Sequence, residues 1–171
     1  MAEAYHHSKN CQNNNNFNKL KQTKPKQQFK ILIVDDDVNI SECFADILTE
    51  RGHIVSVANE SVSCINKCQN YQYDIIFMDF HMDSIDGVDM TDLLKNVCNN
   101  TSLIIAITGD DSVATIRKFK EIGMAGAIIK PINVDLIHKF MNSLETRSNI
   151  DKRVINLMGD TKFKRHLIVF D

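Results

Sequence analysis

The chain has 171 residues, which favours one compact domain with extensions, and its 43% apolar content is enough for a hydrophobic core. No apolar run approaches the roughly 18 residues that a membrane span needs. The N-terminus lacks the apolar stretch of a secretory signal, so we expect a cytoplasmic protein. Its five cysteines include no C-x-x-C pair, which favours buried free thiols over a metal site.

The net charge of −2 is unevenly distributed along the chain. Residues 1–29 carry five lysines and one glutamate, whereas residues 30–147 carry ten basic and eighteen acidic side chains. The acidic excess of the middle segment argues against a nucleic-acid-binding face there, and we expect no nucleic-acid or membrane partner. Residues 1–29 are rich in Asn, Gln and Lys, a composition typical of a disordered tail.

Unbroken apolar runs alternate with segments of helical periodicity across residues 30–147, which we take as the folded domain. The predicted strands are 30–34, 53–58, 74–78, 102–108 and 126–130, and the predicted helices are 38–52, 60–72, 87–98, 111–123 and 133–145. Strands that are apolar throughout indicate a parallel sheet covered on both faces. The pattern therefore predicts a doubly wound α/β fold, a three-layer sandwich around a five-stranded parallel sheet.

Residues 148–171 form an extension whose role the sequence leaves open. Its first apolar group, RVINLM, is compatible with a helical turn. Its second, RHLIVF, is compatible with either a short strand or a hydrophobic patch.

Polar residues stand where the predicted strands end. The first strand is followed by Asp35, Asp36 and Asp37, the third by Asp79, the fourth ends in Thr108, and the fifth ends in Lys130. Ligands of such sheets bind at the carboxyl ends of the strands, where these side chains meet. Clustered carboxylates repel one another unless a cation is present, and Mg²⁺ prefers oxygen ligands.

This set of residues fits an aspartate that accepts a phosphoryl group, with a divalent cation and Lys130 neutralising the phosphoryl oxygens. The Thr108 hydroxyl could donate a hydrogen bond to the same group. Each residue alone is also typical of a helix cap, and we expect Asp37 to cap the helix that follows it. We expect Asp83, Asp86, Asp89 and Asp92 to form a loop and a solvated helix start.

The segments ILIVDDD, IIFMDFHM…DG, IIAITGD and AIIKP resemble, in this order and spacing, the CheY-like receiver domain of two-component response regulators, which has a flavodoxin-like fold. The resemblance covers residues 30–147. It implies that Asp79 is the phosphoacceptor. It also implies that Asp36 binds Mg²⁺ directly with Asp79, that Asp35 acts mostly through water, and that the backbone carbonyl of His81 completes the protein ligands.

By the same resemblance Thr108 is the switch hydroxyl and Gly109 the small residue that follows it. Lys130 pairs with the phosphoryl group, the Lys130–Pro131 bond matches a cis peptide of the family, and Gly87 closes the loop after the phosphoacceptor.

The chain departs from the family pattern at two positions. Asp83 stands where the family commonly has proline. Ala127 stands where an aromatic switch residue is usual, three residues before Lys130, so the usual coupling of a hydroxyl to an aromatic ring is absent. His81, two residues after the phosphoacceptor, flanks the path of the attacking water and is a candidate for setting the lifetime of the phosphoryl group.

The resemblance implies a signalling receiver, not an enzyme that turns over an external substrate. It would take its phosphoryl group from a histidine kinase or a histidine phosphotransfer protein and lose it by its own Mg²⁺-dependent hydrolysis. The expected effector surface spans residues 111–145, and the chain could also act as a relay intermediate or phosphate sink. The cognate kinase and the oligomeric state stay open.

Two other classes are compatible with parts of the sequence. A pseudo-receiver that only binds a partner would explain Ala127, although such proteins usually lose a site residue that this chain keeps. A haloacid-dehalogenase-type phosphatase would use Asp35 and Asp37, but that motif continues with Thr or Val where Asn39 stands. Its additional cap and later acid pair also exceed the room in this chain.

Overall fold

The computed structural model describes residues 27–83, 85–145 and 166–170, and its strands form one six-stranded sheet. The strands are β1 (Lys30–Val34), β2 (Ile54–Ala58), β3 (Ile75–Asp79), β4 (Leu103–Thr108), β5 (Gly126–Ile129) and β6 (Leu167–Val169). Their order is β2-β1-β3-β4-β5-β6. The first five are parallel, and β6 runs antiparallel to β5 at the edge of the sheet.

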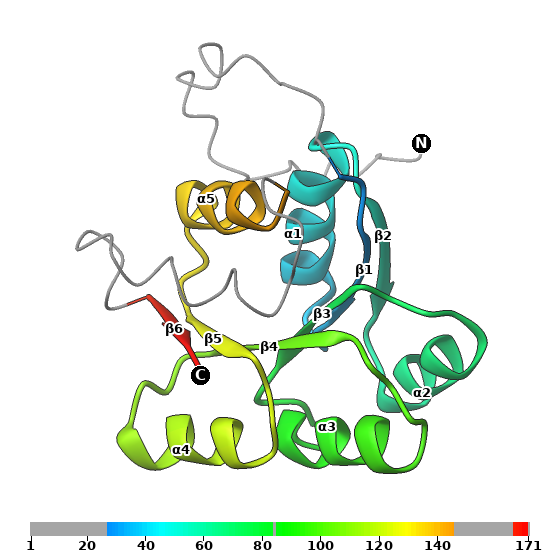
Figure 1. The fold of residues 1–171 in the computed structure, drawn as a ribbon, viewed down its shortest axis with the longest axis vertical. Helices are drawn as coiled ribbons and strands as arrows, with labels where there is room; N and C mark the ends of the chain where they lie inside the picture. Colours follow the sequence, from blue (N-terminus) through cyan, green and yellow to red (C-terminus); the bar gives the residue numbers. More distant parts are fainter. Residues whose placement is uncertain (1–26, 84, 146–165, 171) are drawn as a thin grey trace, which may run out of the picture.

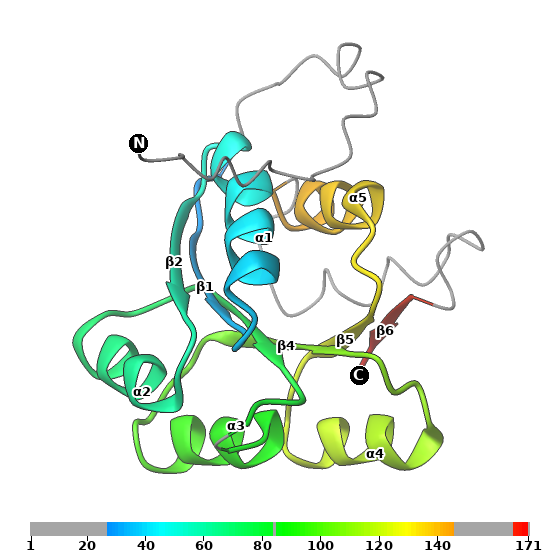
Figure 2. The ribbon, with the colours of Figure 1, turned by 180° about the vertical axis from the view of Figure 1, so that it is seen from behind.

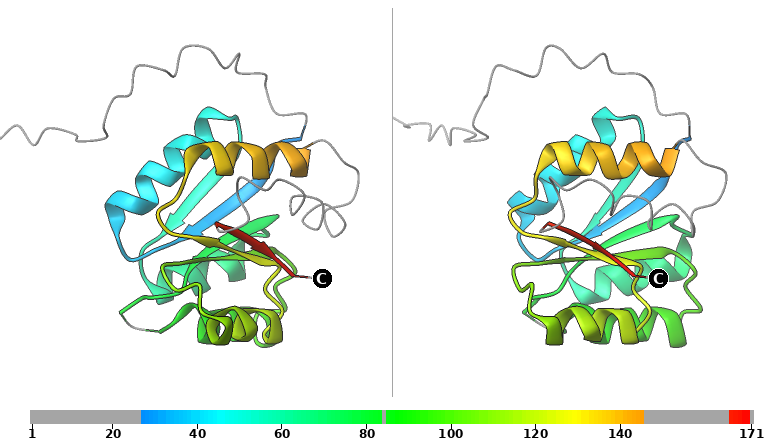
Figure 3. Two further views of the ribbon diagram at one scale, coloured as in Figure 1. Left: turned by 90° about the vertical axis from the view of Figure 1, so that its left-hand side faces the viewer. Right: turned by 60° about the vertical axis from the view of Figure 1, so that its left-hand side comes forward.

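Helices cover both faces of this sheet (Figure 1). They are α1 (Val38–Glu50), α2 (Ser61–Asn70), α3 (Gly87–Asn96), α4 (Val113–Glu121) and α5 (Val134–Glu145). α1 and α5 lie on one face, and α2, α3 and α4 lie on the other, as the reverse view also shows (Figure 2). Seen from the side, the three layers are separate (Figure 3). Among the described helices, none is long and apolar enough to cross a bilayer.

The central strands are apolar because both of their faces are covered. Every residue of β3 is buried, including Asp79 at its end. The ring of Phe77 lies between Phe44 of α1 and Phe140 of α5, with centroid distances of 4.8 Å and 6.1 Å. On the opposite face, Phe80 packs edge-on against Phe119 of α4 at 5.1 Å. The two faces thus form separate apolar clusters that hold the strand ends in place.

The predicted fold class is confirmed, and the sheet has one strand more than the five predicted. The additional strand comes from the RHLIVF segment, for which a strand was one of the two interpretations. Phe29, assigned to the tail on composition, is fully buried, so the packed region begins before the predicted boundary at residue 30. The rest of the predicted tail, residues 1–26, and the predicted turn in RVINLM lie outside the described residues.

Asp37 caps α1, as predicted. Its carboxylate accepts hydrogen bonds from the backbone amides of Asn39 and Ile40, at 2.9 Å and 3.3 Å. Asp86 caps α3 in the same way by accepting from the amide of Asp89 at 2.8 Å. These side chains satisfy amides that have no partner inside the helix.

Replacing Asp37 by alanine is expected to lower the free energy of unfolding by about 1 kcal/mol, because two amides at the start of α1 lose their acceptor. Urea denaturation followed by circular dichroism measures this change. Since the Asp37 side chain serves the helix, Mg²⁺ affinity should stay within about threefold of wild type, an energy difference below 1 kcal/mol. A large loss of Mg²⁺ affinity with unchanged stability would show that Asp37 serves the metal site instead.

Candidate functional site

The parallel strands bring the predicted polar residues to one edge of the sheet. Asp35 follows β1, Asp79 ends β3, Thr108 ends β4 and Lys130 follows β5. β3 lies between β1 and β4 in the strand order, so Asp79 is at the centre of this edge. The expectation that these four side chains converge on one edge therefore agrees with the topology.

Three carboxylates gather there. One oxygen from each of Asp35, Asp36 and Asp79 lies within 4.8 Å of the other two. Asp35 is 1% exposed and Asp79 is 3% exposed, while Asp36 is more accessible. Three oxygen donors at this spacing fit a hard divalent cation, and Mg²⁺ commonly completes such a set with water.

Lys130 is the cation that the chain itself supplies to this cluster. Its Nζ lies 3.0 Å from Asp79 Oδ1 and 3.4 Å from Asp35 Oδ2. Burial lowers the pKa of Lys130, but its hydrogen bonds and charge interactions with Asp79 and Asp35 outweigh this and raise that pKa above its ordinary value. Lys130 is therefore charged at neutral pH, and it offsets one of the three nearby carboxylates.

Asp35 shows that this single lysine does not balance the cluster. Burial and the charge of Asp79 raise the pKa of Asp35 above its ordinary value, although Lys130 acts in the opposite direction. The site thus disfavours the Asp35 carboxylate unless another cation is present. This electrostatic demand and the oxygen donor set both match a bound divalent cation.

Asn59 supports the Asp35 loop, a role that the sequence analysis missed. Its amide nitrogen donates to the backbone carbonyl of Asp35 and to Ser41 Oγ of α1, each at 2.7 Å. The amide of Asp37 also donates to Asp35 Oδ1 at 3.0 Å. The sequence feature that could have indicated this role is the position of Asn59 directly after β2, the strand that pairs with β1.

Thr108 is fully buried, and its hydrogen bonds are made with Asp110. Thr108 Oγ1 accepts from the Asp110 amide at 2.9 Å. The Asp110 carboxylate in turn accepts from Thr115 Oγ1 at 2.6 Å and from the Ser112 amide at 2.8 Å, and these bonds lower the pKa of Asp110. Asp110, which the sequence analysis did not single out, thus links the site hydroxyl to the start of α4.

The loop after β3 folds tightly against the strand end. The Gly87 amide donates to the Phe80 carbonyl at 3.0 Å, and the Asp83 amide donates to Asp36 Oδ2 at 3.0 Å. Asp83, which replaces the usual proline, therefore uses a backbone donor that proline lacks. The His81 side chain is exposed, and its ring lies against Phe80 with centroids 4.4 Å apart.

The remaining predicted positions lie around this centre. The Lys130–Pro131 bond is cis, as predicted. Gly109 is exposed, with no atom within 4 Å of where a Cβ would stand. Ala127 is fully buried in β5, where its neighbours in register are Ala106 of β4 and Ile168 of β6.

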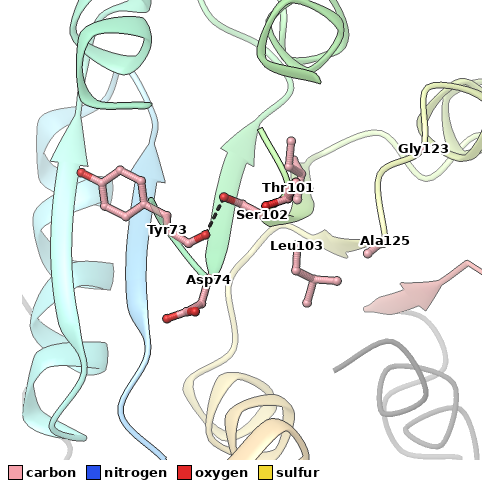
Figure 4. Close-up of a pocket in the computed structure, with 8 residues that line it drawn as sticks. Tyr73, Asp74, Thr101, Ser102, Leu103, Gly123 and Ala125 are labelled. Carbon is pink, nitrogen blue, oxygen red and sulfur yellow. Dashed lines mark hydrogen bonds between the residues drawn. The ribbon is translucent and has the colours of Figure 1, made fainter. Parts of the chain in front are cut away.

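A hollow of about 410 Å³ lies at the opposite edge of the sheet, near the amino ends of β3 and β4 (Figure 4). Its polar groups already serve the fold. Ser102 Oγ donates to the Tyr73 carbonyl at 2.7 Å, and the Asp74 carboxylate accepts from the Lys30 amide at 2.7 Å. The hollow lies at the other end of the strands from the acidic cluster, and among the described residues of its lining Asp74 is the one ionisable carboxylate.

Among curated proteins, the chain resembles the transcription factor SKN7 of Saccharomyces cerevisiae, at 29% identity over 113 residues, covering 66% of this chain and 18% of that protein. It resembles the CAI-1 autoinducer sensor kinase/phosphatase CqsS of Vibrio cholerae at 29% identity over 124 residues, covering 71% of this chain and 18% of that protein. The chain thus spans less than a fifth of the length of these two relatives.

Among solved structures, a two-component response regulator from Clostridium difficile matches with a TM-score of 0.66 and 26% identity, covering 71% of this chain and 99% of that one. The receiver domain of Ssk1 from Saccharomyces cerevisiae, crystallised with the histidine phosphotransfer signalling protein Ypd1, matches with a TM-score of 0.65 over 75% of this chain and 97% of that one; at 18% identity this shows the fold alone. The sequence profile of the response regulator receiver domain matches residues 31–142. The chain therefore belongs to the response regulator receiver domain family.

Proposed function

We propose that the chain accepts a phosphoryl group on Asp79 from a phosphohistidine donor and later releases it by hydrolysis. The observation that carries this proposal is the contact of 3.0 Å between Lys130 Nζ and Asp79 Oδ1 beside two further carboxylates. Asp79 is presented by a rigid, fully buried strand, so its carboxylate has a fixed position at the surface of the site.

In the first step a carboxylate oxygen of Asp79 attacks phosphorus, and the bond from phosphorus to the imidazole nitrogen of the donor breaks. The imidazole leaves with the electron pair and takes a proton from solvent. In the second step water attacks the phosphorus of the aspartyl phosphate. Inorganic phosphate leaves, and the Asp79 carboxylate is restored.

Asp35, Asp36 and Asp79 would hold the Mg²⁺ ion that such a reaction uses, with the His81 carbonyl as a further ligand. When bound, Mg²⁺ neutralises the negative charge on the transferred group. The raised pKa of Asp35 supports this assignment, because a bound cation favours its charged form.

Lys130 would exchange its contact with Asp79 Oδ1 for one with a phosphoryl oxygen, so its positive charge would stay within the site. The Thr108 hydroxyl donates to the Asp110 carbonyl at 3.4 Å, and it would redirect this proton in order to donate to the phosphoryl group. Since the Asp110 carboxylate binds Ser112 and Thr115, a shift of Asp110 would be passed to the start of α4. Phosphorylation would thus change the surface that α4 contributes.

The donor would be a histidine kinase or a histidine phosphotransfer protein, and a downstream effector would bind within residues 111–145. The complex of Ypd1 with the Ssk1 receiver domain supports a histidine phosphotransfer protein as the donor, since that receiver shares this fold. We take residues 30–147 as the receiver unit. Whether it signals through an effector or acts as a relay intermediate follows from the partners that bind it.

The hydrogen bonds at the start of α1 argue against the phosphatase alternative. That reaction needs Asp37 as a free acid or base near Asp35, whereas the Asp37 carboxylate accepts two helix amides. The acidic cluster instead contains Asp36 and Asp79. We therefore assign the chemistry to Asp79.

Intact mass measured after incubation with Mg²⁺ and acetyl phosphate tests the proposal. We expect one added phosphoryl group on the wild type and none on Asp79→Asn. Asp83→Asn is the matched control, because it neutralises an exposed aspartate of the same loop, and it should be labelled like wild type.

A phosphoryl adduct on Asp79→Asn would place the acceptor elsewhere. No adduct on the folded, Mg²⁺-bound wild type, with acetyl phosphate or with a phosphorylated histidine phosphotransfer protein, would leave the pseudo-receiver as the better description.

A further inference from the structure

We define residues 166–170 as the edge segment. It contains β6, which among the described strands is the one that runs antiparallel to its neighbour. It pairs antiparallel to β5, with Ala127 opposite Ile168 (Figure 3). At one end the Ile129 amide donates to the His166 carbonyl at 2.9 Å. At the other end the Phe170 amide donates to the Ala125 carbonyl at 3.1 Å.

The edge segment also places apolar side chains on both faces of the sheet. Leu167 is 8% exposed and belongs to the cluster beneath α1 and α5. Ile168 and Phe170 pack against the cluster beneath α2, α3 and α4. The edge segment thus contacts both helical layers, with Leu167 on one face of the sheet and Ile168 and Phe170 on the other.

The strands beside the edge segment carry small side chains where it pairs with them. Ala106 and Ala127 lie side by side in β4 and β5, and both are fully buried. Two small side chains thus stand in one row that faces the apolar cluster beneath α2, α3 and α4, and Ile168 extends that row. Without the edge segment, β5 would present free backbone groups and an apolar strip to solvent, which is a template for strand addition.

We propose that the outer edge of β5 is a docking site for an extended protein strand and that the edge segment occupies it as an internal ligand. The fitting partner is an extended peptide, antiparallel to β5, with apolar side chains at consecutive positions. Strand addition supplies affinity through backbone bonds and specificity through side-chain pockets. An external strand competes with an internal one whose effective concentration is set by its covalent connection. This proposal does not depend on phosphorylation.

A fluorescent peptide with the sequence of residues 164–171, KRHLIVFD, tests the site in the full-length chain. Ile168→Asp places a charge in the apolar row and should release the internal strand. Val62→Asp is the control, because it puts the same charge on a side chain of α2 that is 66% exposed. Fluorescence anisotropy measures peptide affinity, and the exchange of the Ile129 amide, followed by NMR, reports whether the edge is occupied.

We expect the peptide to bind Ile168→Asp at least about tenfold more tightly than wild type, because the internal competitor is gone. The Ile129 amide should exchange at least about tenfold faster in Ile168→Asp and regain protection when the peptide is added. Val62→Asp should behave as wild type in both measurements. If Ile168→Asp does not fold, Phe170→Ala removes a ring from the same face of the edge segment without adding a charge.

Equal peptide affinity for wild type and the released variant would overturn the proposal. So would an Ile129 amide whose protection is insensitive to Ile168→Asp. A wild-type dimer in native mass spectrometry that dissociates when Ile168 is replaced would also overturn it, because the strand would then come from a second copy.

Discussion

Replacing Asp35 by asparagine is expected to weaken Mg²⁺ binding by at least about thirtyfold, while making the metal-free protein more stable. The loss follows from Coulomb's law: a unit charge about 4 Å from a divalent ion contributes about 2 kcal/mol even at the dielectric constant of water. The gain follows from the raised pKa of Asp35, which shows that the metal-free fold disfavours its charge. Isothermal titration with Mg²⁺ and urea denaturation in EDTA measure the two effects.

The pH dependence of stability in EDTA provides a second test of the same residue. Because the folded-state pKa of Asp35 lies above its unfolded value of about 3.8, its favourable contribution is complete below that pH. This contribution is lost as pH rises through the folded-state pKa. The stability advantage of Asp35→Asn should therefore be small near pH 3.8 and grow toward neutral pH. With saturating Mg²⁺ the order should reverse, since binding requires the carboxylate.

Asp46→Asn is the matched control, because it removes the same charge from the exposed surface of α1. It should leave both Mg²⁺ affinity and the pH profile close to wild type. A loss of stability in EDTA for Asp35→Asn at neutral pH would show that the ion pair with Lys130 outweighs burial and the charge of Asp79.

Gly87→Ala is expected to lower the free energy of unfolding by about 1–3 kcal/mol, the usual cost of overpacking, and to slow labelling of Asp79. A Cβ at Gly87 would stand 2.4 Å from the Asp79 carbonyl oxygen and 3.1 Å from Phe80 Cα. Both contacts are with backbone, so no side-chain rotation relieves them. The strand end that carries Asp79 must shift instead.

Gly109→Ala separates this effect from the general consequence of losing a glycine. Gly109 also lies beside the site, but its added Cβ would meet no atom within 4 Å. Its stability should change by no more than about 0.5 kcal/mol. Urea denaturation and the rate of labelling by acetyl phosphate compare the two variants. Equal effects in both would show that the close packing of Gly87 on β3 does not position Asp79.

The architecture and the centre of the site were predictable because each rests on local pattern and parallel topology. Unbroken apolar runs identify buried parallel strands, and the residues after such strands share one edge of the sheet. Asp79 and Lys130 could therefore be placed together although they are 51 positions apart in the sequence. The cap at Asp37 followed from local pattern, and the cis bond followed from the family resemblance.

The residues that support the site were not predictable, because their roles depend on distant packing. Asn59 reaches Asp35 only because β2 pairs with β1 in the register that aligns Ala58 with Val34. Asp110 follows Thr108 in a common turn sequence, and its link to α4 depends on where Ser112 and Thr115 fall. The pairing of β6 sets Ile168 opposite Ala127, two residues far apart in the sequence, and local periodicity does not indicate such a pairing.

The peptide groups at the end of β5 lie between the proposed phosphorylation site and the edge segment. The Ile129 amide donates to His166, and the next amide, that of Lys130, donates to the Thr108 carbonyl at 2.6 Å. Free-energy coupling between two sites is reciprocal. If a phosphoryl group on Asp79 changes the equilibrium constant for strand binding beside β5 by some factor, the bound strand changes the equilibrium constant for phosphorylation by the same factor. An effector that takes the place of this strand would then also shift the equilibrium between the phosphorylated and the unphosphorylated chain.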